Sequence, residues 1–98
     1  MPKSDSYREF SIELLKDPEH AAGFIEEILS EKDPEPALLS NAIAKVVEAR
    51  RRTNQLSPEA RECLEKLNAM LTESGGAELY GLAELLDAIG MKLAVTLK

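Results

Sequence analysis

Side chains that could act as catalysts are few in this chain. It has one histidine, His20, and one cysteine, Cys63, a combination that can serve as base and nucleophile. They fall in different predicted helices, with neither a third orienting group nor a glycine-rich oxyanion turn beside them. A single cysteine also excludes an internal disulfide and a cysteine-based zinc site. We therefore predict that the protein is not an enzyme and uses no cofactor.

Two acidic clusters could suggest a metal site. Glu26-Glu27 and Glu31–Asp33 lack the alternating oxygen ligands and the turn glycine of a calcium loop. The glycine pair Gly75-Gly76 does not follow a predicted strand, so it is not expected to cradle a phosphate. We interpret the acidic clusters as solvated helix faces and predict no metal site.

A run of three arginines, Arg50-Arg51-Arg52, is the one local feature that points to a partner. The run could bind DNA phosphates or an acidic protein surface. It could equally complement the negative end of a helix dipole, since it closes a predicted helix. The sequence leaves both interpretations open, because three charges alone give only modest affinity at physiological salt.

The overall charge argues against a general nucleic-acid coat protein. The 98 residues include 12 Lys and Arg against 18 Asp and Glu, a net charge of −6. Residues 45–52 carry four basic side chains and one acidic one, so a short basic band lies between two acidic stretches. With 44% hydrophobic residues and only 4% aromatic ones, the core must be aliphatic, which favours packed helices in one domain.

Proline and glycine divide the chain into helical segments. Asp17-Pro18, Asp33-Pro34 and Ser57-Pro58 each combine a residue that caps helix N-termini with a proline suited to the first turn. Apolar residues follow at helical spacing. The predicted helical segments are a turn at 11–16, a helix from 18 through 29, one from after 34 to about 51, one over 58–73 and one over about 78–89.

The two ends of the chain give different signals. Residues 1–10 have few apolar anchors, and we expect them to be partly disordered, which leaves 11–98 as the single helical domain. Residues 91–97 alternate as in a short β-strand. A lone strand needs a partner, so we expect it to pair with a second subunit. Its candidate dimer-interface residues are Met91, Leu93, Val95 and Leu97.

Targeting signals are not evident. The opening residues MPKSDSYRE are polar and contain no apolar signal-peptide region. No apolar run approaches the roughly 20 residues that cross a bilayer. A cytoplasmic location without membrane attachment is expected.

Longer stretches of the chain resemble a known family. The segments that carry the resemblance are Phe10–Leu29, Lys32–Glu35, Ala44–Arg50, Leu71–Gly76, Leu82 and Leu85–Val95. In order and spacing they resemble the addiction-module antidote family of small antitoxins with a phage-repressor-type helix-turn-helix. The resemblance implies a small, five-helix, repressor-like all-α domain. It also implies a DNA-binding dimer that represses its own operon, with neutralisation of a RelE/ParE-like toxin as a further expected role.

The resemblance places the helix-turn-helix at residues 54–72, with the recognition helix at about 64–71. This sequence departs from the family pattern there: the turn glycine is replaced by Arg61 and the helix cap by Cys63, a poor N-cap. The residues themselves predict one uninterrupted helix over 58–73. The polar positions left as DNA-binding candidates are Arg50, Arg51, Arg52, Arg61, Lys66 and Asn68.

Two hypotheses therefore stand side by side. The first is a DNA-binding regulator of the antitoxin type, bound to its operator as a homodimer. The alternative is a dimeric protein-interaction module that keeps the antitoxin scaffold with a degenerate helix-turn-helix. Glu59, Glu62 and Glu65, which would oppose a phosphate backbone, favour the alternative.

Overall fold

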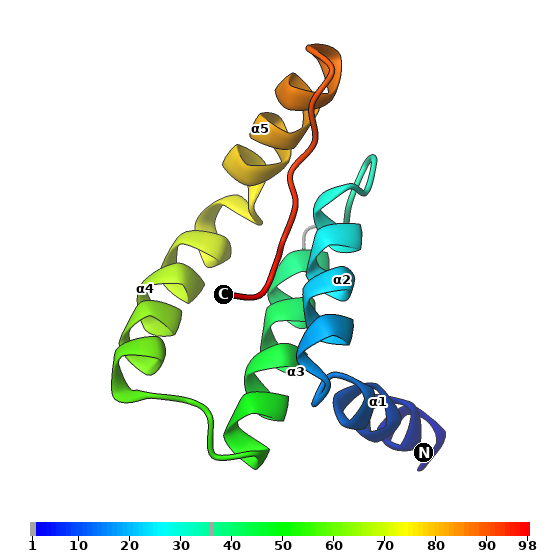
Figure 1. Ribbon diagram of the computed structural model, residues 1–98, viewed down its shortest axis with the longest axis vertical. Coiled ribbons are helices and arrows are strands. Elements are labelled where there is room, and N and C mark those ends of the chain that lie inside the picture. Colours follow the sequence, from blue (N-terminus) through cyan, green and yellow to red (C-terminus); the bar gives the residue numbers. More distant parts are fainter. Residues whose placement is uncertain (1, 36) are drawn as a thin grey trace.

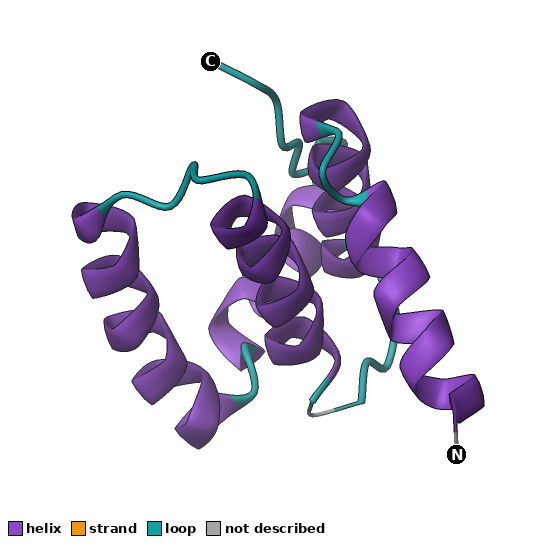
Figure 2. Ribbon diagram, turned by 90° about the horizontal axis from the view of Figure 1, so that it is seen from below, coloured by secondary structure: helices purple, strands orange, loops and turns teal. Residues whose placement is uncertain are grey.

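The computed structural model describes residues 2–35 and 37–98, and within them the fold is all-α (Figures 1 and 2). The prediction of a five-helix all-α domain is confirmed. The helices, joined by loops, are α1 (Pro2–Leu14), α2 (Pro18–Leu29), α3 (Leu38–Arg52), α4 (Pro58–Ser74) and α5 (Ala77–Ala88).

Two helix starts are capped as the sequence predicts. The Asp17 carboxylate accepts a hydrogen bond of 3.1 Å from the Glu19 N–H at the start of α2. The Ser57 hydroxyl accepts one of 3.1 Å from the Ala60 N–H at the start of α4. Each satisfies a backbone donor that the helix itself leaves free. Helix α3 begins later in the chain than Asp33-Pro34 suggests. A second proline follows Glu35, and a residue before a proline disfavours helical backbone.

The core lies where α1, α2 and α3 meet. Ile12 of α1, Leu15 in the turn that follows it, Ala21 of α2 and Ala49 of α3 are buried together, with Phe24 and Val46 packed against them. Because alanine faces the other helices at two of these positions, the backbones approach closely. Helices α2 and α3 run side by side, and α1 packs across their lower end in Figure 1.

Helices α4 and α5 form an arm beside this core. A loop over 53–57 leads from α3 to α4, and two glycines turn the chain into α5 (Figure 1). Gly75 and Gly76 have φ values of 64° and 90°, a conformation that a side chain disfavours. Gly76 is buried with Leu39 and Leu71, which joins the corner of the arm to the start of α3.

The prediction of one helix over 58–73 is confirmed, since α4 is continuous from Pro58 to Ser74. Leu64 and Leu67 are half-buried and Leu71 is buried, so the leucine stripe of this helix faces the protein. The stripe continues through the position where a helix-turn-helix would bend.

The predicted strand at 91–97 is not present, and the described residues contain no strand (Figure 2). The chain turns back at the end of α5, where the Met91 N–H donates to the Leu86 carbonyl at 2.7 Å, and then runs between the arm and α2 (Figure 1). Leu93 and Val95 are half-buried, whereas Met91 and Leu97 are exposed. The segment has no neighbouring strand to pair with. The alternation of apolar residues in its sequence therefore appears only as partial burial of alternate side chains.

The first helix is longer than the sequence indicates. The sequence predicts only a helical turn at 11–16, but α1 already begins at Pro2 and includes residues expected to be partly disordered. Two contacts that sequence spacing does not reveal hold this helix to α3. Glu9 pairs with Arg52, and the Lys45 ammonium lies 5.6 Å from the centre of the Tyr7 ring.

Among the described residues, no helix has the length and apolar character to span a membrane.

Candidate nucleic-acid interface

The three arginines occupy the last turn of α3, where the sequence places them. Two of them are held by carboxylates. Arg51 donates two hydrogen bonds to Glu48, of 2.9 Å from Nε and 2.6 Å from Nη2. Arg52 donates from Nε to the same carboxylate at 2.9 Å. Glu48 therefore binds two guanidinium groups at once.

Arg52 also reaches across to α1. Its Nη1 and Nη2 donate to the two carboxylate oxygens of Glu9 at 2.7 and 3.0 Å, the bidentate geometry that suits a guanidinium. Glu13 lies 3.8 Å away on the same helix. All the guanidinium nitrogens of Arg52 thus face carboxylates of its own chain.

The electrostatics of this cluster follow from these contacts. Hydrogen bonds from Arg51 and then from Arg52 lower the pKa of Glu48 from 4.5 to about 2. The hydrogen bond from Arg52 also lowers the pKa of Glu9. The Glu9 and Glu48 carboxylates in turn raise the pKa of Arg52. The carboxylates are therefore ionised at neutral pH, and they offset the positive charge of Arg51 and Arg52.

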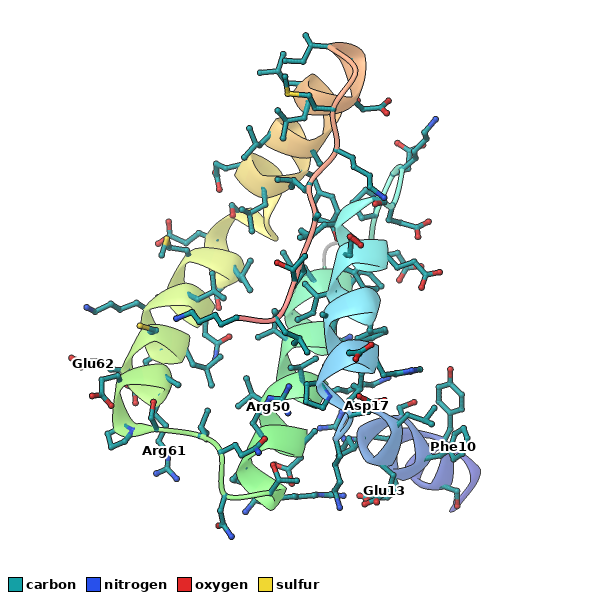
Figure 3. All side chains as sticks on the ribbon, in the orientation of Figure 1. Phe10, Glu13, Asp17, Arg50, Arg61 and Glu62 are labelled. Carbon is teal, nitrogen blue, oxygen red and sulfur yellow. The ribbon has the colours of Figure 1, made fainter. Side chains whose placement is uncertain are left out.

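Arg50 differs from its two neighbours. Its Nη1 donates to the Gln55 side-chain oxygen at 3.2 Å, and it forms no ion pair within the described part of the chain. Arg61, in the first turns of α4, is exposed. Figure 3 shows both side chains in the lower part of the molecule, on either side of the loop that joins α3 to α4. Neither Arg50 nor Arg61 pairs with a carboxylate within the described part of the chain.

The remaining DNA-binding candidates on α4 are spread around the helix. Asn68 is seven positions from Arg61 and shares its side, but Glu65 lies between them on that side. Lys66 has Glu59, Glu62 and Glu73 at helical spacings of four or seven positions, so acids line its side of the helix. All these side chains are exposed. The helix consequently presents no continuous basic stripe.

No family model, curated protein or solved structure matches this chain.

The structure also contains a cavity that the sequence analysis did not identify. It has a volume of about 850 Å³ and lies between the loop after α2, one side of α5 and the C-terminal segment. The Tyr80 hydroxyl is buried beside it and has no hydrogen-bond partner among the described residues. Burial and the nearby charge of Glu31 raise the Tyr80 pKa. The one available sequence signal was that Tyr80 is the only aromatic residue after position 24.

The histidine and the cysteine of this chain lie on different helices. His20 lies in the first turns of α2 and Cys63 on an exposed side of α4, with α3 between these helices in Figure 1. No group of three or more potential metal ligands occurs in residues 2–35 and 37–98. The cavity lining includes carboxylates and lysines but neither of these two residues.

Proposed function

We propose that this protein is a protein-interaction module built on an antitoxin-type scaffold, without a working DNA-reading helix pair. The observation that carries the proposal is the continuity of α4 from Pro58 to Ser74. A helix-turn-helix needs a turn that lets a second helix enter the major groove while the first crosses the backbone. Such a turn would interrupt α4.

The arginine cluster supports the same conclusion. Arg51 and Arg52 would have to exchange Glu48 and Glu9 for DNA phosphates. That exchange leaves carboxylates close to the phosphate backbone, which opposes binding. On α4, the glutamates beside Lys66 and between Arg61 and Asn68 add to this repulsion.

The exposed side of α1 supports binding to a protein. Tyr7 and Phe10 are 69% and 62% exposed and lie on one side of the helix with Leu14. Aromatic residues are enriched in protein interfaces, where they contribute large contact areas. By the resemblance, the partner would be a RelE/ParE-like toxin, and both proteins would act in the cytoplasm.

A DNA-binding regulator of the antitoxin type is the second candidate. It is favoured by Arg50 and Arg61, which flank the same loop next to the N-terminus of α4, where free backbone N–H groups attract anions. This arrangement offers phosphate contacts but no side chains arranged to read bases.

Fluorescence anisotropy separates the two functions. The protein is titrated against a duplex from its own upstream region and against a random duplex over a salt series. We expect weak binding at low salt, equal for both duplexes, and reduced by Arg50→Gln and Arg61→Gln. A preference for the upstream duplex would establish the regulator and overturn the proposal.

Co-expression tests the protein partner. The chain is produced with a RelE/ParE-like toxin from the same operon, and the complex is isolated through a tag on the toxin. We expect a complex of fixed stoichiometry that Phe10→Asp disrupts and that the control Asn41→Asp, on the exposed side of α3, leaves intact. Absence of a complex with the unaltered chain would contradict the proposed interaction.

A further inference from the structure

The cavity beside α5 carries negative charge on two sides. Figure 1 shows the loop after α2 on one side and α5 on the other, with the C-terminal segment between them. The lining contains five carboxylates and only two ammonium groups, those of Lys32 and Lys92, which gives a net charge of −3. The carboxylates are Glu31, Asp33 and Glu35 of the loop and Glu84 and Asp87 of α5.

These five carboxylates are left without cationic partners. None of them forms an ion pair within residues 2–35 and 37–98, and all five side chains are exposed. The half-buried part of the lining is instead apolar, with Leu29, Ala83 and Leu93. The cavity therefore combines an apolar floor, formed by these three residues, with an anionic rim, formed by the five carboxylates.

The Tyr80 hydroxyl is a second feature of the cavity and is independent of the carboxylates. Tyr80 lines the cavity, and its hydroxyl oxygen is buried with no hydrogen-bond partner among the described residues. Most buried polar side-chain atoms have a partner in the protein or in bound solvent, so an orphaned hydroxyl calls for an explanation. A hydrogen-bond donor on a ligand in the cavity would supply the missing partner.

From these features we propose that the cavity binds an aliphatic polyamine, a chain of methylene groups that carries several ammonium groups. The ammonium groups pair with rim carboxylates on both sides, and the methylene groups lie on the apolar floor. One ammonium N–H donates a hydrogen bond to the Tyr80 oxygen. The proposal is independent of the function proposed above, since it requires neither a toxin nor DNA.

Other classes of small ligand fit this cavity less well. A divalent metal ion needs several oxygen ligands around one point, and no group of three or more potential metal ligands occurs in the described part of the chain. The negative lining repels an anion. A neutral apolar ligand would cover carboxylates without pairing them. The volume of about 850 Å³ lies within the range of small-molecule sites.

Titration of the full chain with spermidine, followed by NMR of the backbone amides, tests the proposal. At low salt we expect a dissociation constant below about 1 mM, since pairing of exposed charges gives modest affinity. The amides that shift should belong to the loop over 30–35, to α5 and to residues 92–93. Added salt should weaken the binding, because the rim is exposed to solvent.

Two matched double variants locate the charges that matter. Glu84→Gln with Asp87→Gln should raise the dissociation constant about 5- to 10-fold. The control Glu62→Gln with Glu65→Gln removes the same charge from exposed positions of α4 and should leave spermidine binding unchanged. Circular dichroism checks that both double variants remain helical.

Tyr80→Phe isolates the hydroxyl. It should weaken spermidine binding about 3- to 10-fold. It should not lower the free energy of unfolding, because the hydroxyl has no partner in the described part of the chain to lose. A merely structural role for this hydroxyl would give the opposite pattern.

Four outcomes would overturn the proposal. One is equal weakening in the two double variants, which would show general attraction to an acidic surface. Another is that Mg²⁺ produces the same amide shifts at the same concentration. A third is unchanged binding in Tyr80→Phe. The fourth is that a trilysine peptide binds the same residues more tightly than spermidine, which would assign the cavity to a basic segment of a protein.

Discussion

The guanidinium of Arg52, in the last turn of α3, donates two parallel hydrogen bonds of 2.7 and 3.0 Å to the carboxylate of Glu9 on α1. This pair joins the first helix to the end of the third. It also occupies an arginine that the sequence offers as a DNA ligand. One contact thus fixes α1 on the core and lowers the positive charge of the arginine run.

Removing the Glu9 carboxylate should loosen α1. In Glu9→Gln we expect backbone amides of α1 to exchange with deuterium about 2- to 5-fold faster, the size of effect typical of an exposed ion pair. Glu27→Gln, on an exposed position of α2, serves as the control and should leave α1 unchanged. Equal exchange in α1 for both variants would show that Arg52 does not anchor this helix.

Acid should weaken the fold through Glu48. Its pKa is 4.5 in an unconstrained chain and about 2 in the fold, so between these values the unfolded chain binds the proton and the folded one does not. The stabilisation by Glu48 is therefore complete above pH 4.5 and is lost as the pH falls towards 2. Urea unfolding at pH 6 to 2 should show a shallower loss of stability in Glu48→Gln and in Arg51→Gln. If the free energy of unfolding falls with pH as steeply in both variants as in the unaltered protein, Glu48 is not the source of the acid sensitivity.

Ile12 and Leu14 are neighbours on α1 with opposite environments. Ile12 is 1% exposed in the core, whereas Leu14 is 41% exposed. We expect Ile12→Ala to lower the free energy of unfolding by about 2–4 kcal/mol, and Leu14→Ala to lower it by less than about 1 kcal/mol. Chemical denaturation measures both changes. Similar losses would mean that α1 is not packed through Ile12.

Gly76 is a position where a side chain would be strained. Its φ of 90° disfavours a side chain, and an added Cβ would lie 2.8 Å from the Leu39 side chain. We expect Gly76→Ala to cost at least about 1–2 kcal/mol of unfolding free energy. The matched change Gly81→Ala, inside α5 with open space around it, should instead stabilise by about 0.5–1 kcal/mol. Thermal unfolding distinguishes the two, and a neutral Gly76→Ala would show that the α4–α5 corner is not constrained.

The sequence by itself determined α2, α4, α5 and the end of α3. Asp17-Pro18 and Ser57-Pro58 mark helix starts because capping and proline geometry act over a few residues. The leucine spacing of 58–73 was enough to predict an uninterrupted α4 against the bend implied by the resemblance. Such features are local, so they can be inferred before the helices are placed in space.

Only the tertiary structure decided which charges and apolar side chains remain available. Glu9 and Arg52 are far apart in the chain, and their pairing depends on how α1 lies across α3. The alternation of 91–97 indicated a strand, but strand pairing requires a neighbouring backbone, and in this chain the segment packs beside helices instead. The spacing of Leu79, Leu82 and Leu85 looks like a core pattern in the sequence, and their exposure follows from the position of α5 at the end of the arm.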